Sequence, residues 1–175
     1  MSDSSVTSPG GGADLPRFPD LEVRSLQGAE WVLPRDLPVP RALVICAFKQ
    51  WHQSLVDEWI GWATAKAGVA PSPLGLDPGA SSLVIEVPVL GRRFRPVRGF
   101  IDGGMTAGIR VPAVLARTFT AYTDVAAFCR AAGIVSTETV TAFVVRPDGV
   151  VLARVSGVPD VAKEALVAGA LGAGA

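Results

Sequence analysis

The sequence is poor in the residues on which metal and thiol chemistry most often depends. It contains 2 cysteines and 1 histidine in 175 residues. Cys46 and Cys129 lie far apart and form neither a CxxC motif nor a zinc-binding pattern. Because His52 has no cysteine or second histidine near it, we predict no metal site and no cofactor. Sparse, unpaired cysteines are typical of a reducing compartment, so we expect the protein to be cytoplasmic.

Charge of one sign and long apolar runs are also lacking. Lysine plus arginine and aspartate plus glutamate number 16 each, so no overall field favours nucleic acid or an anionic membrane. Apolar residues make up 49% of the chain, but they never form the run of about 18 residues that a membrane span needs. We therefore expect no nucleic-acid partner and no membrane insertion.

The N-terminal segment differs in composition from the rest of the chain. Residues 1–16 are rich in serine and glycine and lack the basic and apolar parts of a secretory signal. We predict a disordered tail over residues 1–16. Residues 17–175 have the length of one domain and are predicted to form one.

The most informative stretch covers residues 41–68. Residues 42–48 are seven consecutive apolar positions, which predicts a strand buried on both faces. Residues 54–63 then place their apolar side chains on one arc, which predicts an amphipathic helix with Ser54 and Asp57 as its start signal. Open α/β sheets place their functional residues where a central strand meets the following helix.

Glycine and proline divide the rest of the chain into further strands and helices. Asp124 and Gly133 are expected to cap the two ends of one helix. The order of elements predicts an α/β protein, with a mixed central sheet and helices on both faces. The predicted elements are a hairpin over 21–26 and 30–34, strands over 83–90, 119–123, 140–145 and 150–155, short helices within 91–110, and helices over 125–132 and 159–171.

This order of elements resembles the thioredoxin fold, and three local motifs strengthen the resemblance. Residues 18–21, Phe-Pro-Asp-Leu, resemble the opening segment of peroxiredoxins and thioredoxin-like reductases. Residues 122–134 resemble their "D…F…YGV" helix, and residues 143–149 resemble their "FLIDrdG" hairpin. The resemblance covers residues 18–171 and implies a thioredoxin-like three-layer sandwich with an N-terminal β-hairpin extension. The chain is similar to the alkyl hydroperoxide reductase/thiol-specific antioxidant group and, in pattern, more to the thioredoxin-fold assembly chaperones of mitochondrial ATP synthase.

The positions that carry thiol chemistry in that superfamily hold other residues here. Aligning Trp51 with the tryptophan of the WCxxC motif puts His52 and Leu55 at the two cysteine positions. The peroxiredoxin motif PxxxTxxC is also absent from residues 48–57. Val140 stands at the position of the family's cis-proline, so the Thr139–Val140 peptide bond should be trans. The resemblance therefore implies the fold without its redox chemistry.

Three residues remain as weak catalytic candidates. Cys46 lies inside the predicted central strand and is expected to be a small buried hydrophobe. Cys129 lies in a predicted helix beside Arg130, which could lower the pKa of its thiol as in a resolving cysteine. His52 has no orienting carboxylate in its own segment, so we expect a capping or surface histidine rather than a general base. Trp51 is expected at the rim, where it could line a groove.

The densest charge cluster gives the binding candidates Arg92, Arg93, Arg95 and Arg98, with Asp102 shortly after them. If the strand over 83–90 runs parallel to the central strand, this cluster lies on the same rim as Trp51 and His52. Arginine suits bidentate contacts to carboxylate or phosphate. We predict that this rim binds a protein partner or a small acidic ligand. A solvated basic loop and a homodimer stay open as alternatives.

Two functions compete on these observations. The favoured one is a redox-inactive thioredoxin-like protein, acting as a binding or chaperone/assembly-type module through the former active-site rim. The alternative is an antioxidant enzyme, a divergent thiol peroxidase or thiol-disulfide oxidoreductase that uses Cys129 or Cys46. Accessibility of the two thiols separates these functions, because a catalytic thiolate must be reachable.

Overall fold

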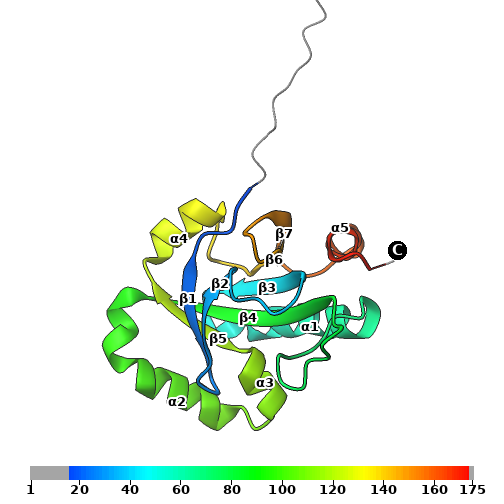
Figure 1. The fold of residues 1–175 in the computed structure, drawn as a ribbon. Helices are drawn as coiled ribbons and strands as arrows, with labels where there is room; N and C mark the ends of the chain where they lie inside the picture. The colour runs from blue at the N-terminus through cyan, green and yellow to red at the C-terminus, as the bar shows by residue number, and fades with distance from the viewer. Residues whose placement is uncertain (1–15, 174–175) are drawn as a thin grey trace, which may run out of the picture.

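A seven-stranded mixed sheet divides the protein into two cores (Figure 1). The computed structural model describes residues 16–173, so the predicted tail lies almost entirely outside the described residues. Helices cover both faces of the sheet, which gives the predicted three-layer thioredoxin-like sandwich. The strand order is β2-β1-β5-β4-β3-β6-β7.

The elements follow the predicted order along the chain. The strands are β1 (Leu21–Ser25), β2 (Glu30–Leu33), β3 (Arg41–Ala47), β4 (Ser82–Gly91), β5 (Phe119–Thr123), β6 (Thr141–Val145) and β7 (Val151–Ser156). The helices are η1 (Gln50–His52), α1 (Gln53–Lys66), η2 (Arg92–Val97), α2 (Arg98–Gly108), α3 (Pro112–Arg117), α4 (Val125–Ala132) and α5 (Val161–Leu171).

Strand β3 lies at the centre, as its apolar sequence predicts. It pairs in parallel with β4 and antiparallel with β6. Because successive side chains point to opposite faces, Leu43 and Ile45 enter one core while Val44 and Cys46 enter the other. The N-terminal hairpin β1–β2 is confirmed and joins the sheet by antiparallel pairing of β1 with β5.

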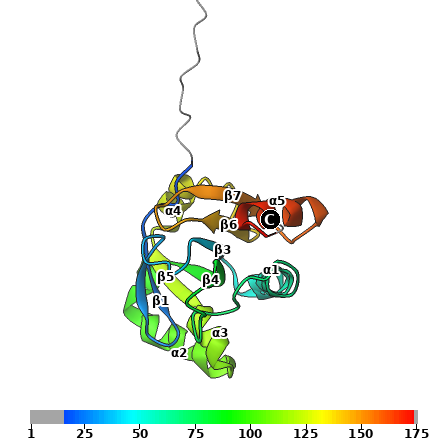
Figure 2. The same cartoon turned by 45° about the vertical axis from the view of Figure 1, so that its right-hand side comes forward.

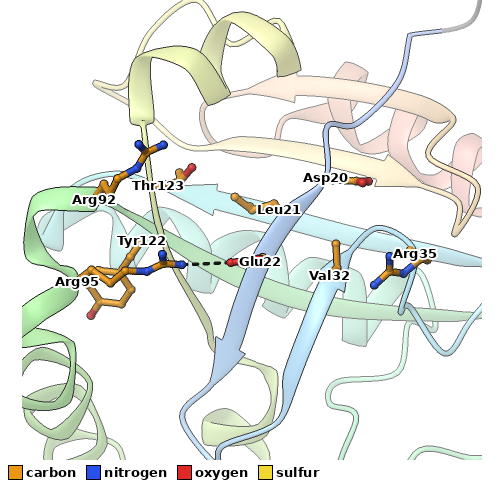
Figure 3. Close-up of a pocket in the computed structure, with 9 residues that line it drawn as sticks. All are labelled: Asp20, Leu21, Glu22, Val32, Arg35, Arg92, Arg95, Tyr122 and Thr123. Atoms are coloured by element: carbon orange, nitrogen blue, oxygen red, sulfur yellow. Dashed lines mark hydrogen bonds and ion pairs between the residues drawn. The ribbon is translucent and has the colours of Figure 1, made fainter.

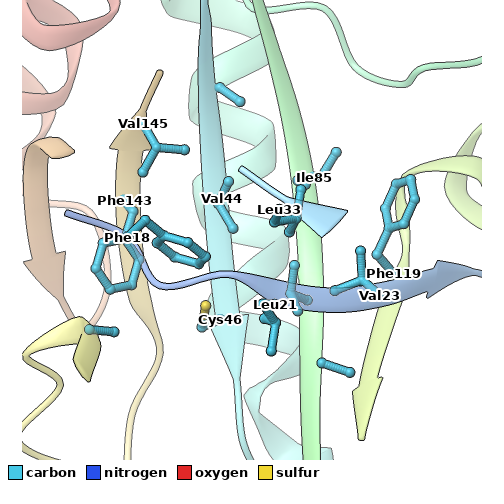
Figure 4. Packing of buried hydrophobic residues seen from close by; sticks show 14 of the residues in the cluster. Phe18, Leu21, Val23, Leu33, Val44, Cys46, Ile85, Phe119, Phe143 and Val145 are labelled. Atoms are coloured by element: carbon cyan, nitrogen blue, oxygen red, sulfur yellow. The ribbon is translucent and has the colours of Figure 1, made fainter. Parts of the chain in front are cut away.

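The two cores are covered by different helices. Helix α4 packs with Phe18, Leu21, Val44 and Phe143 on one face, where the rings of Phe18 and Phe143 meet edge-on (Figure 4). Helices α1 and α5 lie together on the other face (Figure 2). A chain that buries both faces of its sheet in this way needs strands with continuous apolar runs, which is what β3 and most of β4 supply.

The helix boundaries agree with the sequence at some ends and differ at others. Asp124 caps α4 by accepting a hydrogen bond from the N–H of Ala127, and Gly133 ends the helix in the left-handed conformation, both as predicted. The predicted start signal for α1 is wrong. The helix begins at Gln53, directly after η1, with no side-chain cap. Helix α5 is capped by Asp160, so Pro159 precedes the helix instead of lying in its first turn.

The segment between β4 and β5 forms η2 and α2, which agree with the short helices predicted within residues 91–110, and then α3. Helix α2 contains no buried residue. It is attached to β5 through polar side chains, because Thr120 and Tyr122 point away from the core that holds Phe119 and Ala121.

Trp59 is fully buried in α1, and its Nε1–H donates a hydrogen bond to the carbonyl of Gly157 (2.7 Å). Trp62 is buried one turn along, but no hydrogen bond of its indole is found within residues 16–173. We expect W59F to lower the free energy of unfolding by about 1 kcal/mol more than W62F, the net value of one buried hydrogen bond. Urea denaturation of both variants measures the difference. Equal losses would show that this bond does not stabilise the fold.

Candidate functional site

His52 lies where β3 leads through η1 into α1, at the position that the resemblance to the thioredoxin fold aligns with an active-site cysteine. Its side chain has 0% exposed surface, so the expectation of a surface or capping histidine is wrong. The N–H of Phe48 donates to its Nδ1 (3.1 Å), and the Trp51 ring meets its ring edge-on at 4.4 Å. Trp51 itself is 59% exposed and lies at the rim, as expected.

The hydrogen bond from Phe48 assigns the tautomer of the neutral ring. Since Nδ1 accepts a hydrogen bond, the neutral imidazole carries its proton on Nε2. Nε2 is buried and has no hydrogen-bond partner within residues 16–173. Burial lowers the pKa of His52 below 6.5, although the nearby Glu138 opposes the shift. In this neutral ring, the unprotonated nitrogen Nδ1 already accepts the hydrogen bond from Phe48. The ring is therefore poorly suited to act as a base.

The loop before β6 covers this histidine. Glu138 of this loop pairs with Lys49 (3.2 Å), which lies between β3 and η1; both side chains are exposed, so the pair stabilises the loop only weakly. The Thr139–Val140 bond is trans, as predicted, and Val140 is fully buried. The position that the resemblance aligns with the cis-proline thus holds a packed aliphatic side chain.

Both cysteines are free and buried in the core that α4 covers. Cys46 is completely enclosed, as expected, and burial strongly raises the pKa of its thiol, with a smaller contribution from Cys129. Cys129 is 8% exposed, and burial raises the pKa of its thiol too. The suggestion that Arg130 lowers this pKa is therefore wrong. Arg130 is exposed, and burial is the cause of the raised pKa.

A buried carboxyl group in β4 was missed by the sequence analysis. Glu86 is 2% exposed, receives a hydrogen bond from Nε2 of Gln53 (3.3 Å) and lies against the hydroxyl of Thr118. That hydroxyl has one hydrogen and also contacts the carbonyl of Val114 (2.8 Å), so a proton on Glu86 would satisfy both contacts. Burial accordingly raises the pKa of Glu86. An acid inside the apolar run of residues 83–90 was the available signal.

The arginine cluster does not act as one unit in the structure. Arg98 pairs with Asp102 (3.2 Å) and lies over the ring of Tyr122 (5.0 Å). Asp102 also accepts hydrogen bonds from Tyr122 (2.7 Å) and Thr120 (3.2 Å). The contacts with Thr120 and Tyr122 attach α2 to β5, whereas the pair of Arg98 and Asp102 lies within α2. The charged groups of Arg98 and Asp102 are engaged within the protein, which leaves the predicted binding role to the exposed arginines of η2.

Arg92 and Arg95 line a groove between η2 and the β1–β2 hairpin (Figure 3). We call this the arginine groove. Its volume is about 610 Å³, and its other walls include Glu22, Arg35 and Tyr122. Arg95 forms an ion pair with Glu22 across it (3.2 Å). Glu22, Arg35 and Tyr122 come from three separate strands or turns, so no local motif could have indicated them.

The predicted common rim is divided into two regions. Strand β4 is parallel to β3, so His52 and Arg92 both follow carboxyl ends of parallel strands, as expected. Their contacts are nevertheless separate. The His52 region is built from η1, α1 and the loop before β6, whereas the arginine groove is built from η2, β1, β2 and β5. The proposed binding role of these residues stays a prediction.

Comparison with known proteins gives a match in structure only. No protein-family model matches the chain, and no curated protein matches its sequence. Among solved structures, the exposed lipoprotein thioredoxin of Streptococcus pneumoniae is similar with a TM-score of 0.55 and 11% identity, covering 88% of this chain and 98% of that one. A thioredoxin-family thiol:disulfide interchange protein from Chlorobium tepidum has a TM-score of 0.51 and 15% identity, covering 92% and 99%.

A third similar structure is BsSco, a member of the Sco family of cytochrome c oxidase assembly proteins. It has a TM-score of 0.55 and 11% identity, covering 91% of this chain and 94% of that one. Identities this low show the fold alone. The chain has the thioredoxin-like fold, and the comparisons do not assign it to the peroxiredoxin-like or chaperone-like group within that superfamily.

Two further observations concern cofactors and membranes. Within residues 16–173, no group of three or more histidine, cysteine, aspartate or glutamate side chains could hold a metal ion. Over the same residues, no helix has the length and apolar character to cross a bilayer.

A pH prediction follows from His52, the single histidine of the chain. Its pKa is lower in the folded state than the unfolded value of about 6.5, so the unfolded state binds more protons as pH falls through that value. The free energy of unfolding should therefore decrease between about pH 7.5 and pH 5.5. Its ring proton should titrate by NMR with a midpoint below 6.5.

The matched control is H52N, because the asparagine oxygen can accept the hydrogen bond from Phe48. In this variant the His52 contribution to the pH dependence should vanish, while any contribution from Glu86 stays. Identical pH profiles for wild type and H52N would contradict the assignment of a neutral, buried imidazole.

Proposed function

We propose that this chain is a redox-inactive thioredoxin-like protein that binds carboxylate-bearing partners in the arginine groove, as a binding or assembly-type module. The observation that carries the first part is the replacement of the active-site cysteine by a buried, neutral His52. A thiolate at a helix start is the nucleophile of thioredoxin chemistry, and neither His52 nor Leu55 can supply one. A cytoplasmic location, inferred from the sparse cysteines, belongs to the same proposal.

The two cysteines of the chain do not replace the missing ones. Reactive thiols are accessible and have a lowered pKa, whereas Cys46 and Cys129 are buried and both have a raised pKa. One observation favours the alternative, a thiol-disulfide oxidoreductase. Both cysteines lie in the same core. Exchange with a substrate would require this core to open.

The arginine groove supports the binding part of the proposal. Its Arg95 already holds a carboxylate, that of Glu22, and the ion pair is exposed on both sides. An exposed pair of this kind is worth only about 0.2–1 kcal/mol, so a carboxylate from a partner can displace Glu22 at little cost. Arg92 and Arg35 line the same groove and can engage a second acidic group.

The redox part is tested with the two thiols. We expect neither Cys46 nor Cys129 to give a dimedone adduct after a brief peroxide pulse, because oxidation follows thiolate character and exposure. The protein should also fail to accelerate the reduction of insulin by dithiothreitol. Intact mass and turbidity are the readouts. A stoichiometric sulfenic adduct or an intramolecular disulfide would establish the oxidoreductase instead.

The binding part is tested with polyglutamate as the acidic probe. R95Q should weaken binding, and E22Q should strengthen it about twofold to fivefold, because it removes the internal competitor for Arg95. R130Q, at an exposed arginine on α4, is the matched control and should leave binding unchanged. Affinity is measured by fluorescence anisotropy at low salt. If R95Q and E22Q bind with wild-type affinity, the groove is not the site.

A further inference from the structure

We infer that a second surface of this chain docks onto an anionic lipid bilayer. This surface is formed by Arg93, Phe94, Val97 and Phe100, where η2 continues into the first turn of α2, and we call it the η2–α2 tip. It goes beyond the proposed function, because its side chains are not those that line the arginine groove.

The η2–α2 tip exposes large apolar side chains that the fold does not cover. Phe100 is 87% exposed, Val97 50% and Phe94 37%. No residue of η2 or α2 is buried, so the whole segment lies on the outside of the sheet (Figure 1). Apolar side chains gathered on one exposed segment mark an interaction surface, whereas scattered ones need no explanation.

The charge around these side chains is positive. Residues 91–98 contain four arginines and no acidic residue. The guanidinium of Arg93 lies over the Phe94 ring (4.8 Å), which places a cation beside an exposed aromatic side chain. The nearest acid along the chain, Asp102, is turned inward by Arg98, Thr120 and Tyr122. Arg95 is paired with Glu22 and Arg98 with Asp102, so the outer side of the tip combines apolar groups with the positive charge of Arg93.

An anionic bilayer fits this combination better than another protein surface. In a symmetric dimer through the tip, the arginines of one copy would face those of the other, and this repulsion disfavours a second copy. A protein partner would have to supply every wall of a pocket for Phe100, because the neighbouring Gly99 and Gly103 contribute no side chains. A bilayer requires no such matching. Apolar side chains enter its headgroup region while basic side chains attract anionic lipid.

Vesicle sedimentation tests this inference with the full chain. Wild type should sediment with phosphatidylcholine vesicles that contain about 30% phosphatidylserine, and not with pure phosphatidylcholine vesicles. R93Q should weaken the partition about fivefold, the contribution of one basic residue near an anionic surface. F100A should weaken it about tenfold, because it removes an inserted aromatic ring. Raising the salt concentration should release the wild type.

The controls use exposed residues elsewhere on the chain. V135A removes an apolar group that is 96% exposed, and R130Q removes a charge from α4, so both should partition like the wild type. F100A should also bind polyglutamate normally, which keeps this test separate from that of the arginine groove. No sedimentation with the anionic vesicles, or equal partition of F100A and wild type, overturns the inference. The inference is also overturned if F100A loses polyglutamate binding and the wild type does not bind the vesicles. The tip would then bind an acidic protein.

Discussion

The structure depends on the pairing of β3 with a neighbour on each side while both of its faces are buried. Parallel pairing with β4 and antiparallel pairing with β6 fix the register of the central sheet. The alternating side chains of β3 supply both cores, so the helices on the two faces are positioned by the same seven residues. The end of β3 in turn determines where α1 begins and places His52 beneath the loop before β6.

This arrangement explains how the chain keeps the thioredoxin-like fold with no cysteine where β3 leads into α1. The thioredoxin-like position at the end of β3 is built by backbone pairing and by packing, and neither requires sulfur. Filled by a neutral imidazole and by Val140, it becomes part of the interior. The exposed arginines lie instead in η2, which directly follows β4. The end of β4 pairs with β5, and η2 therefore lies beside β5 and β1.

Local patterns in the sequence predicted most of the fold. The apolar run of β3, the cap at Asp124 and the turn at residues 146–149 each depend on neighbours in the chain, and each was confirmed. The burial of His52 could not be predicted, because the covering loop lies about 90 residues away and pairing brought it there. The arginine groove depends in the same way on Glu22 from β1, which only the sheet order brings to Arg95.

The composition of α2 has a consequence for the dynamics of the protein. Four of its eleven residues are glycine, each costing about 1 kcal/mol of helix stability relative to alanine, and the helix buries no side chain in compensation. Its attachment to β5 rests on the hydrogen bonds that Asp102 accepts from Thr120 and Tyr122 and on Arg98, which lies over the Tyr122 ring. Helix α2 is thus a unit that can unfold locally at low free-energy cost while β3 and both cores stay intact. Its amide hydrogens would exchange with solvent long before those of the central strand.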